Sequence, residues 1–93
     1  MPPVNPIIFA GTETLSLRQL DELNNLPKGT SFRWFKACDA ELVEGRDYYY
    51  LPADSHAELI EQLRVAGQIY TSTRHLLLLT RNGYQHIRAR SQG

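Results

Sequence analysis

Residues 16–51 read SLRQLDELNNLPKGTSFRWFKACDAELVEGRDYYYL, and this stretch decides the fold. It predicts two short helices joined by a tight turn, followed by an aromatic strand. Ser16, with Gln19 three residues later, has capping-box spacing and starts the first helix. A proline and a glycine bound the turn, and Thr30 is the expected N-cap of the second helix. This order is typical of a helix-turn-helix, which places its second helix in the major groove of DNA.

The apolar residues of the second helix separate a core side from a side that is free for a partner. Phe32, Phe35, Cys38 and Leu42 are spaced by three, three and four residues, which predicts one apolar arc. Burial of each phenylalanine would contribute about 1.5–3 kcal/mol, so we expect this arc in the core. Arg33 falls roughly opposite the arc, and the basic side of the helix should therefore remain open.

The expected DNA contacts lie at the start of this helix, in the acid-free window from Lys28 to Lys36. The N-terminal residues of a recognition helix are the ones that reach base edges. Arg33 could bind a guanine edge with two hydrogen bonds, whereas Lys36 would meet a phosphate. Thr30 and Ser31 could donate to phosphate together with exposed backbone N–H groups. The alternative interpretation is that these cations only solubilise an exposed face.

Three further candidates for DNA contact are Trp34, Arg46 and Arg74. Trp34 falls between the apolar arc and the outer side, which favours half-buried packing over contact with a sugar, a thymine methyl or a dimer partner. Arg74 lies between two expected strands, at the position of a wing, where an arginine can enter the minor groove. Arg46 is a similar candidate, although its acidic neighbours weaken its field. For both arginines, a solvated loop position is the alternative.

The remaining pattern predicts a small sheet supported by helices. We expect a hairpin over residues 7–15, strands over residues 46–51, 68–70 and 75–79, a third helix opened by Ser55 with Glu58, and a last helix capped by Thr80. Residues 76–79 lack alternation, which predicts a strand covered on both faces. In the tyrosine run, alternation places Tyr49 opposite Tyr48 and Tyr50, so packing is favoured over a base-stacking surface.

The whole pattern predicts an α+β fold, a small winged-helix-like helix-turn-helix domain with a short antiparallel sheet. A length of 93 residues corresponds to one domain. We expect residues 1–6 to be a loose arm and residues 88–93 a mobile tail. The longest apolar run has four residues, too short for a membrane span, and the start lacks the features of a secretory signal.

Charge is distributed unevenly although the net charge is zero. Residues 1–27 sum to −2, residues 28–36 to +3, residues 37–61 to −6 and residues 62–93 to +5. Such a surface could bind phosphate on one side and repel it on the other.

The sequence does not favour an enzyme, a metal site or a cofactor. The three histidines lack metal-ligand spacing, the acids are dispersed, and every glycine stands singly rather than in a phosphate loop. The single cysteine, Cys38, falls on the apolar arc and excludes an internal disulfide, which fits a reducing cytoplasm.

Several segments resemble a known family. These are Thr14–Leu23, Leu26–Thr30, Phe35, Val43–Leu51 and Leu78–Tyr84, the last of which is similar to a closing "L-T-x-x-G-Y" element. Together they resemble the N-terminal DNA-binding domain of phage antirepressor-type proteins, the KilA-N / ORF-six N-terminal family. The resemblance implies a compact α+β domain in a phage, prophage or plasmid regulator, with Lys28, Thr30, Arg33 and Lys36 on the DNA side. Many family members carry a further C-terminal domain, so this chain would be a stand-alone binding module.

We therefore expect a small regulator that binds double-stranded DNA in the cytoplasm of a host cell, with a homodimer as its expected form. The main alternative is a protein-interaction module that inhibits or modulates a host or phage regulatory protein. An excisionase-like protein that bends DNA is a further option within the DNA-binding class, and a nuclease is a distant one.

Overall fold

A four-stranded antiparallel sheet forms the centre of the computed structural model, which describes residues 5–92. Along the chain the elements are β1 (Ile7–Phe9), β2 (Thr12–Ser16), α1 (Leu17–Leu23), α2 (Thr30–Cys38), the short 3-10 turn η1 (Asp39–Glu41), β3 (Tyr48–Leu51), α3 (Ala53–Val65), β4 (Leu76–Thr80) and α4 (Arg81–Gln92). The strand order is β1-β2-β4-β3. The predicted α+β class, the antiparallel sheet and the 7–15 hairpin are confirmed.

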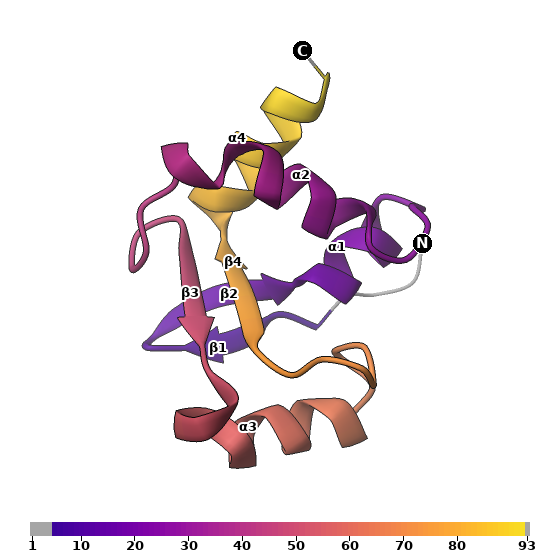
Figure 1. The fold of residues 1–93 in the computed structure, drawn as a ribbon, viewed down its shortest axis with the longest axis vertical. Helices are drawn as coiled ribbons and strands as arrows, with labels where there is room; N and C mark the ends of the chain where they lie inside the picture. Colours follow the sequence, from indigo (N-terminus) through magenta and orange to yellow (C-terminus); the bar gives the residue numbers. More distant parts are fainter. Residues whose placement is uncertain (1–4, 93) are drawn as a thin grey trace.

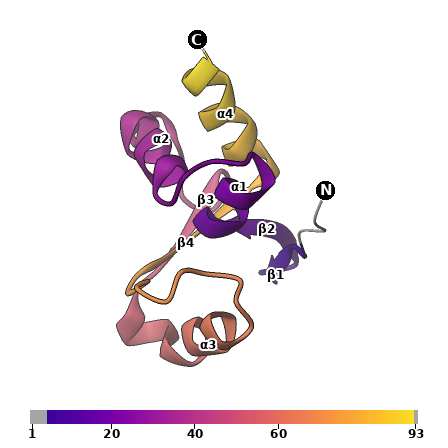
Figure 2. The same ribbon diagram turned by 90° about the vertical axis from the view of Figure 1, so that its right-hand side faces the viewer.

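The sheet separates two helical layers (Figures 1 and 2). α1, α2 and α4 cover one face and α3 covers the other. β4 lies in the middle of the sheet, and its leucines alternate between the layers: Leu76 and Leu78 pack with α3, whereas Leu79 packs with α1, α2 and α4. The prediction that this strand is covered on both faces is confirmed.

The tyrosines of β3 alternate in the same way. Tyr48 packs edge-on against Phe35 of α2, with ring centroids 5.1 Å apart. Tyr49 packs against Phe9 of β1 on the opposite face, at 5.0 Å. The predicted division of the tyrosines between two faces is therefore confirmed.

The predicted strand at residues 68–70, and with it the wing, is absent. Residues 66–75 form a loop between α3 and β4. Side chains occupy the backbone carbonyls that a ladder would use: the Ser16 hydroxyl donates to Gln68 at 2.5 Å, and Arg18 donates to Ile69 at 3.2 Å. Ile69 is buried in the core and anchors the loop there.

Two helix boundaries also differ from expectation. α3 begins at Ala53, directly after Pro52, rather than at Ser55, and it is kinked at His56, where φ is −132° and ψ is 31°. α4 continues to Gln92, so the expected mobile tail at residues 88–92 is helical, whereas Gly93 lies outside the described residues. No glycine or proline interrupts α4 after Gly83, which allows the helix to continue.

Of the expected loose arm, residues 1–4 lie outside the described residues. The Asn5 carbonyl accepts hydrogen bonds from the side chains of Gln19, at 2.6 Å, and Gln68, at 3.2 Å. The end of the arm is therefore attached to α1 and to the 66–75 loop.

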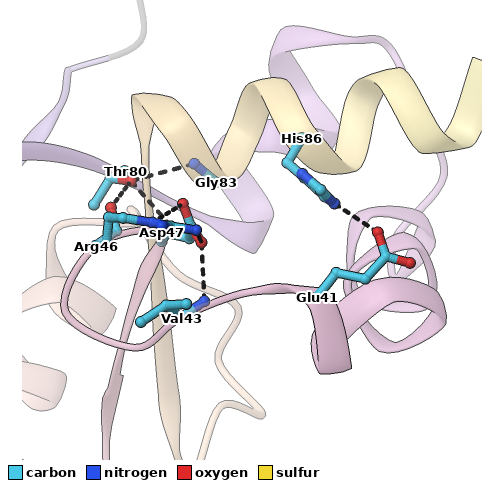
Figure 3. Close-up of polar contacts among 7 residues, drawn as sticks. All are labelled: Glu41, Val43, Arg46, Asp47, Thr80, Gly83 and His86. Carbon is cyan, nitrogen blue, oxygen red and sulfur yellow. Dashed lines mark hydrogen bonds and ion pairs between the residues drawn. The ribbon is translucent and has the colours of Figure 1, made fainter.

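The turn before β3 is interlocked with the start of α4 (Figure 3). The Thr80 hydroxyl donates to the carbonyls of Arg46 and Asp47, at 2.8 and 3.0 Å, and accepts the Gly83 N–H at 3.2 Å. Thr80 thus caps α4, as predicted. A Cβ atom at Gly83 would lie 1.9 Å from the Asp47 carbonyl oxygen, so the close approach requires glycine.

Candidate nucleic-acid interface

α2 presents a different side to solvent from the one expected. Its buried side chains are Ser31, Phe35 and Cys38, at helical spacings of four and three. Phe32 is 45% exposed, which contradicts the expected core position. The predicted arc extended the helical spacing to Leu42, but α2 ends at Cys38, so Leu42 reaches the core after the η1 turn. The exposed side of α2 therefore combines Phe32 with Arg33 and Lys36.

The N-terminus of α2 already holds an anion. The N-cap is Gly29, with a φ of 90°, and Thr30 is the first helical residue, so the predicted Thr30 cap is wrong by one position. The carboxylate of Asp21 on α1 accepts the backbone N–H groups of Gly29, at 3.0 Å, and Ser31, at 2.8 Å. A carboxylate at this position satisfies both the unpaired N–H groups and the positive end of the helix dipole.

This geometry corrects the expectation that Thr30 and Ser31 offer donors to phosphate. Ser31 is completely buried, and Thr30 is buried with its hydroxyl donating to the Pro27 carbonyl at 2.8 Å. The backbone N–H groups of Gly29 and Ser31 belong to Asp21. The Ser31 hydroxyl is therefore inaccessible to DNA, and the Thr30 hydroxyl is already engaged by the Pro27 carbonyl and by Arg33.

Tyr70 completes the environment of Asp21 by donating its hydroxyl to the carboxylate at 2.6 Å. Burial of Asp21 opposes its ionisation, but the donors from Tyr70, Ser31 and Gly29 outweigh burial and lower the pKa of the carboxyl. Burial and the nearby Asp21 charge raise the pKa of Tyr70. A charged, hydrogen-bonded carboxylate thus connects α1, the start of α2 and the 66–75 loop.

The predicted cations around α2 are in place, and each has a weak local partner. Arg33 is exposed and donates to the Thr30 hydroxyl at 3.3 Å. Lys36 forms an exposed ion pair with Asp39 at 3.3 Å. Lys28 lies 5.0 Å from the centroid of the Tyr70 ring. Exposed contacts of this kind contribute little stability, so a phosphate could replace them at little cost.

The other three candidates do not join this surface. Trp34 is half-buried against the core cluster of α1, α2 and α4, as the packing interpretation expected. Arg46 is exposed on the turn before β3 and pairs with Asp47 at 3.1 Å; this pairing lowers the pKa of the Asp47 carboxyl. Arg74 is exposed on the 66–75 loop, and no hairpin presents it to a groove.

Sequence reasoning missed a groove beside the exposed side of α2. Two hollows, of about 330 and 450 Å³, meet where both are lined by Phe32, His75 and Leu77. The larger one continues to Tyr50, which is 42% exposed on β3. The smaller one continues to Lys28 and Tyr70. These residues come from three separate segments of the chain, 28–32, 50 and 70–77, so helical or strand periodicity could not bring them together.

The two helical layers differ in charge. In the layer of α1, α2 and α4, the helices α2 and α4 together carry five arginine or lysine residues and no acid, while α1 carries two acids and one arginine; α3 carries three acids and one arginine. α2 and α4 pack directly on each other. The acidic turn η1 offsets part of the positive charge, because Glu41 pairs with His86 of α4 (Figure 3). Glu41 also pairs with Arg90 of the same helix.

Within the part of the chain that the structure describes, no group of three or more histidine, cysteine, aspartate or glutamate side chains is arranged to hold a metal ion. None of the helices in residues 5–92 is both long enough and apolar enough to cross a membrane.

Comparisons of the chain with protein-family models, with curated proteins and with solved structures found no match.

Proposed function

We propose that this protein is a small regulator of the phage or prophage type, which binds double-stranded DNA through the exposed side of α2. α1 and α2 would act as a helix-turn-helix with a six-residue connection, longer than the usual turn of three or four residues. Such a regulator would work in the cytoplasm of a host cell, with a second copy bound where the DNA site is palindromic.

One observation carries the proposal: the exposed side of α2 holds Phe32, Arg33 and Lys36, in a helical layer separated by the sheet from the acidic helix α3. A bound duplex would then face the basic layer, while α3 stays away from the phosphates. The near-zero net charge is compatible with this arrangement because the opposite charges are separated in space.

Each exposed side chain of α2 has a distinct role in this proposal. Arg33 would bind a guanine edge, and Lys36 would exchange Asp39 for a phosphate. Phe32 would contact a thymine methyl group, an apolar contact made in the major groove. The buried Asp21 would not touch DNA but would fix the direction of α2.

The proposal is tested by binding to random-sequence duplex DNA at low and at physiological salt. We expect salt-sensitive binding that Arg33→Glu/Lys36→Glu removes. For the single change Arg33→Glu, Arg74→Glu is the matched control, because it makes the same charge change on the 66–75 loop. Equal losses in these two variants, or no binding by the folded wild-type protein at low salt, would overturn the proposal.

The role of Phe32 is tested on a duplex selected from a random library. Replacing individual thymines by uracil removes only the methyl group. We expect one such replacement to weaken wild-type binding by about tenfold and to have no effect on Phe32→Ala, because that variant lacks the contact. Equal sensitivity of both proteins at every thymine would exclude the methyl contact.

The groove favours one second candidate, a protein-interaction module. Phe32 and Tyr50 are exposed aromatic side chains beside a hollow, and aromatic residues are enriched in protein interfaces. In this case α2 would dock on an acidic host or phage regulatory protein. Absence of DNA binding would favour this function, and binding of such a partner should be lost in Phe32→Ser/Tyr50→Ser but kept in Val65→Ser, a change at an exposed apolar residue of α3.

A further inference from the structure

α4 carries a second basic surface that the α2 site does not include. Arg81, Gln85 and Arg88 are exposed and follow one another at spacings of four and three, so they form one stripe along the helix. Arg81 and Arg88 are seven residues apart, which corresponds to about 10 Å along the axis.

Arg46 extends the stripe beyond the first turn of α4. It lines the same hollow, of about 340 Å³, as Arg81 and Asn82. The interlock between Asp47 and Gly83 fixes the Arg46 turn against the helix. Arginines from two distant segments therefore lie on one side of the molecule.

The cations on the η1 flank of α4 pair with an acid of that turn. On the flank toward η1, His86 and Arg90 both contact Glu41, at 2.8 and 3.3 Å. On the stripe, Arg88 lies 6.0 Å from the Tyr84 ring centroid, and α4 itself contributes no acid. Near Arg81 the acids are Glu13, which lines the hollow, and the buried Asp47, which is paired with Arg46.

Over residues 81–90 of α4 the stripe has no large exposed apolar side chain, and the Arg46 turn adds a single one, Val43, which is less than a membrane or a protein partner would need. Its exposed neighbours on α4 are Asn82 and Ala89, while Ile87 is buried in the core. A helix that lies on a membrane inserts an apolar face, and a protein interface is organised around desolvated apolar or aromatic anchors. Phosphate backbone contacts need only cations and hydrogen-bond donors, which arginine, asparagine and glutamine supply.

We propose that the stripe of Arg46, Arg81 and Arg88 contacts the DNA phosphate backbone without reading sequence, as a second contact beside α2. This inference rests on the proposed function. Ile87 and the Tyr84–Asn24 hydrogen bond hold α4 against the rest of the fold, and α2 packs on α4, so the two basic surfaces keep a fixed separation.

The test measures binding of the full chain to random-sequence and selected duplexes over a range of KCl concentrations. The slope of log K against log [salt] is negative, and each lost phosphate contact reduces its magnitude by about 0.9. We expect Arg81→Gln/Arg88→Gln to reduce the magnitude of this slope by about 1.8 and to weaken binding to both duplexes equally. Arg90→Gln is the control: it removes one of the two charges that the double variant removes, from the same helix but on the flank that pairs with Glu41, and it should leave the slope nearly unchanged.

The possible outcomes separate this inference from the proposed function. No DNA binding by the wild-type protein at low salt would remove both. Wild-type binding with an unchanged slope in Arg81→Gln/Arg88→Gln would overturn the α4 contact alone. A third outcome would assign the stripe to a membrane surface instead. In that case the wild-type protein would bind vesicles of anionic lipid, the double variant would not, and the salt slope of DNA binding would be the same for both.

Discussion

The two sides of the sheet are packed alike but differ in the surface that they present. Leu78 and Leu79 are neighbours in β4 and equally buried, one beneath α3 and the other beneath α1, α2 and α4. Outside these cores, α3 is acidic, while α2 and α4 are basic. Packing therefore requires only that each helix bury one apolar side, and the charge of the other side is free to serve a function.

The largest effect on stability is expected on the buried side of α2, in contrast to its exposed side. Phe35→Ala should lower the free energy of unfolding by about 3–5 kcal/mol, because it opens a cavity among α1, α2 and α4. Phe32→Ala should cost less than about 1 kcal/mol, since Phe32 remains nearly half exposed in the folded state. Urea denaturation measures the free energy of unfolding of both variants. Similar losses of stability would mean that Phe32 is buried together with Phe35, as the sequence predicted.

The next largest effect on stability is expected where the Arg46 turn contacts the start of α4. Gly83→Ala should cost about 2–3 kcal/mol, because the added methyl group collides with backbone rather than with a flexible side chain. Gly67→Ala is the control: its Cβ would be free of close contacts, but its φ of 75° is strained for alanine, which costs about 1 kcal/mol. Thermal unfolding compares the two, and a milder loss in Gly83→Ala would contradict the close approach.

A smaller, pH-dependent effect on stability is expected at Asp21, whose carboxylate accepts backbone N–H groups at the start of α2. Asp21→Asn should cost about 1–3 kcal/mol at neutral pH by weakening three hydrogen bonds to the carboxylate. Since the folded-state pKa is lowered, the stabilisation is complete above the ordinary value of 3.8 and is lost as the pH falls through the folded pKa.

The stability difference between wild type and Asp21→Asn should therefore shrink in acid below pH 3.8. Denaturant unfolding of both proteins over a pH series measures it, and Tyr70→Phe, which removes only one donor, should fall between them. A difference that stays constant into strong acid would show that the charge of Asp21 is not involved.

Local signals predicted much of the fold. Ser16 and Gln19 form both hydrogen bonds of the capping box, Thr80 caps α4, and the leucine run of β4 is covered on both faces. Each of these follows from residues within a few positions of one another, where chain geometry leaves few alternatives.

Long-range contacts decided what the sequence did not predict. The wing fails because Ser16 and Arg18 occupy carbonyls about fifty residues away along the chain. The α2 N-terminus is closed by Asp21, which an acid-free window from Lys28 to Lys36 could not indicate. Arg33 and Lys36 were identified correctly as exposed, whereas Phe32 was placed on the wrong side.

The central claim is that DNA binds on the α2 side of the sheet and not on the α3 side. Its most direct test is an NMR titration of the full chain with random-sequence duplex DNA at low salt. The account predicts that backbone amide signals of Phe32, Arg33 and Lys36 shift or broaden, and that those of Glu58 and Glu61 on α3 do not. Changes centred on α3, or no changes at all, would contradict it.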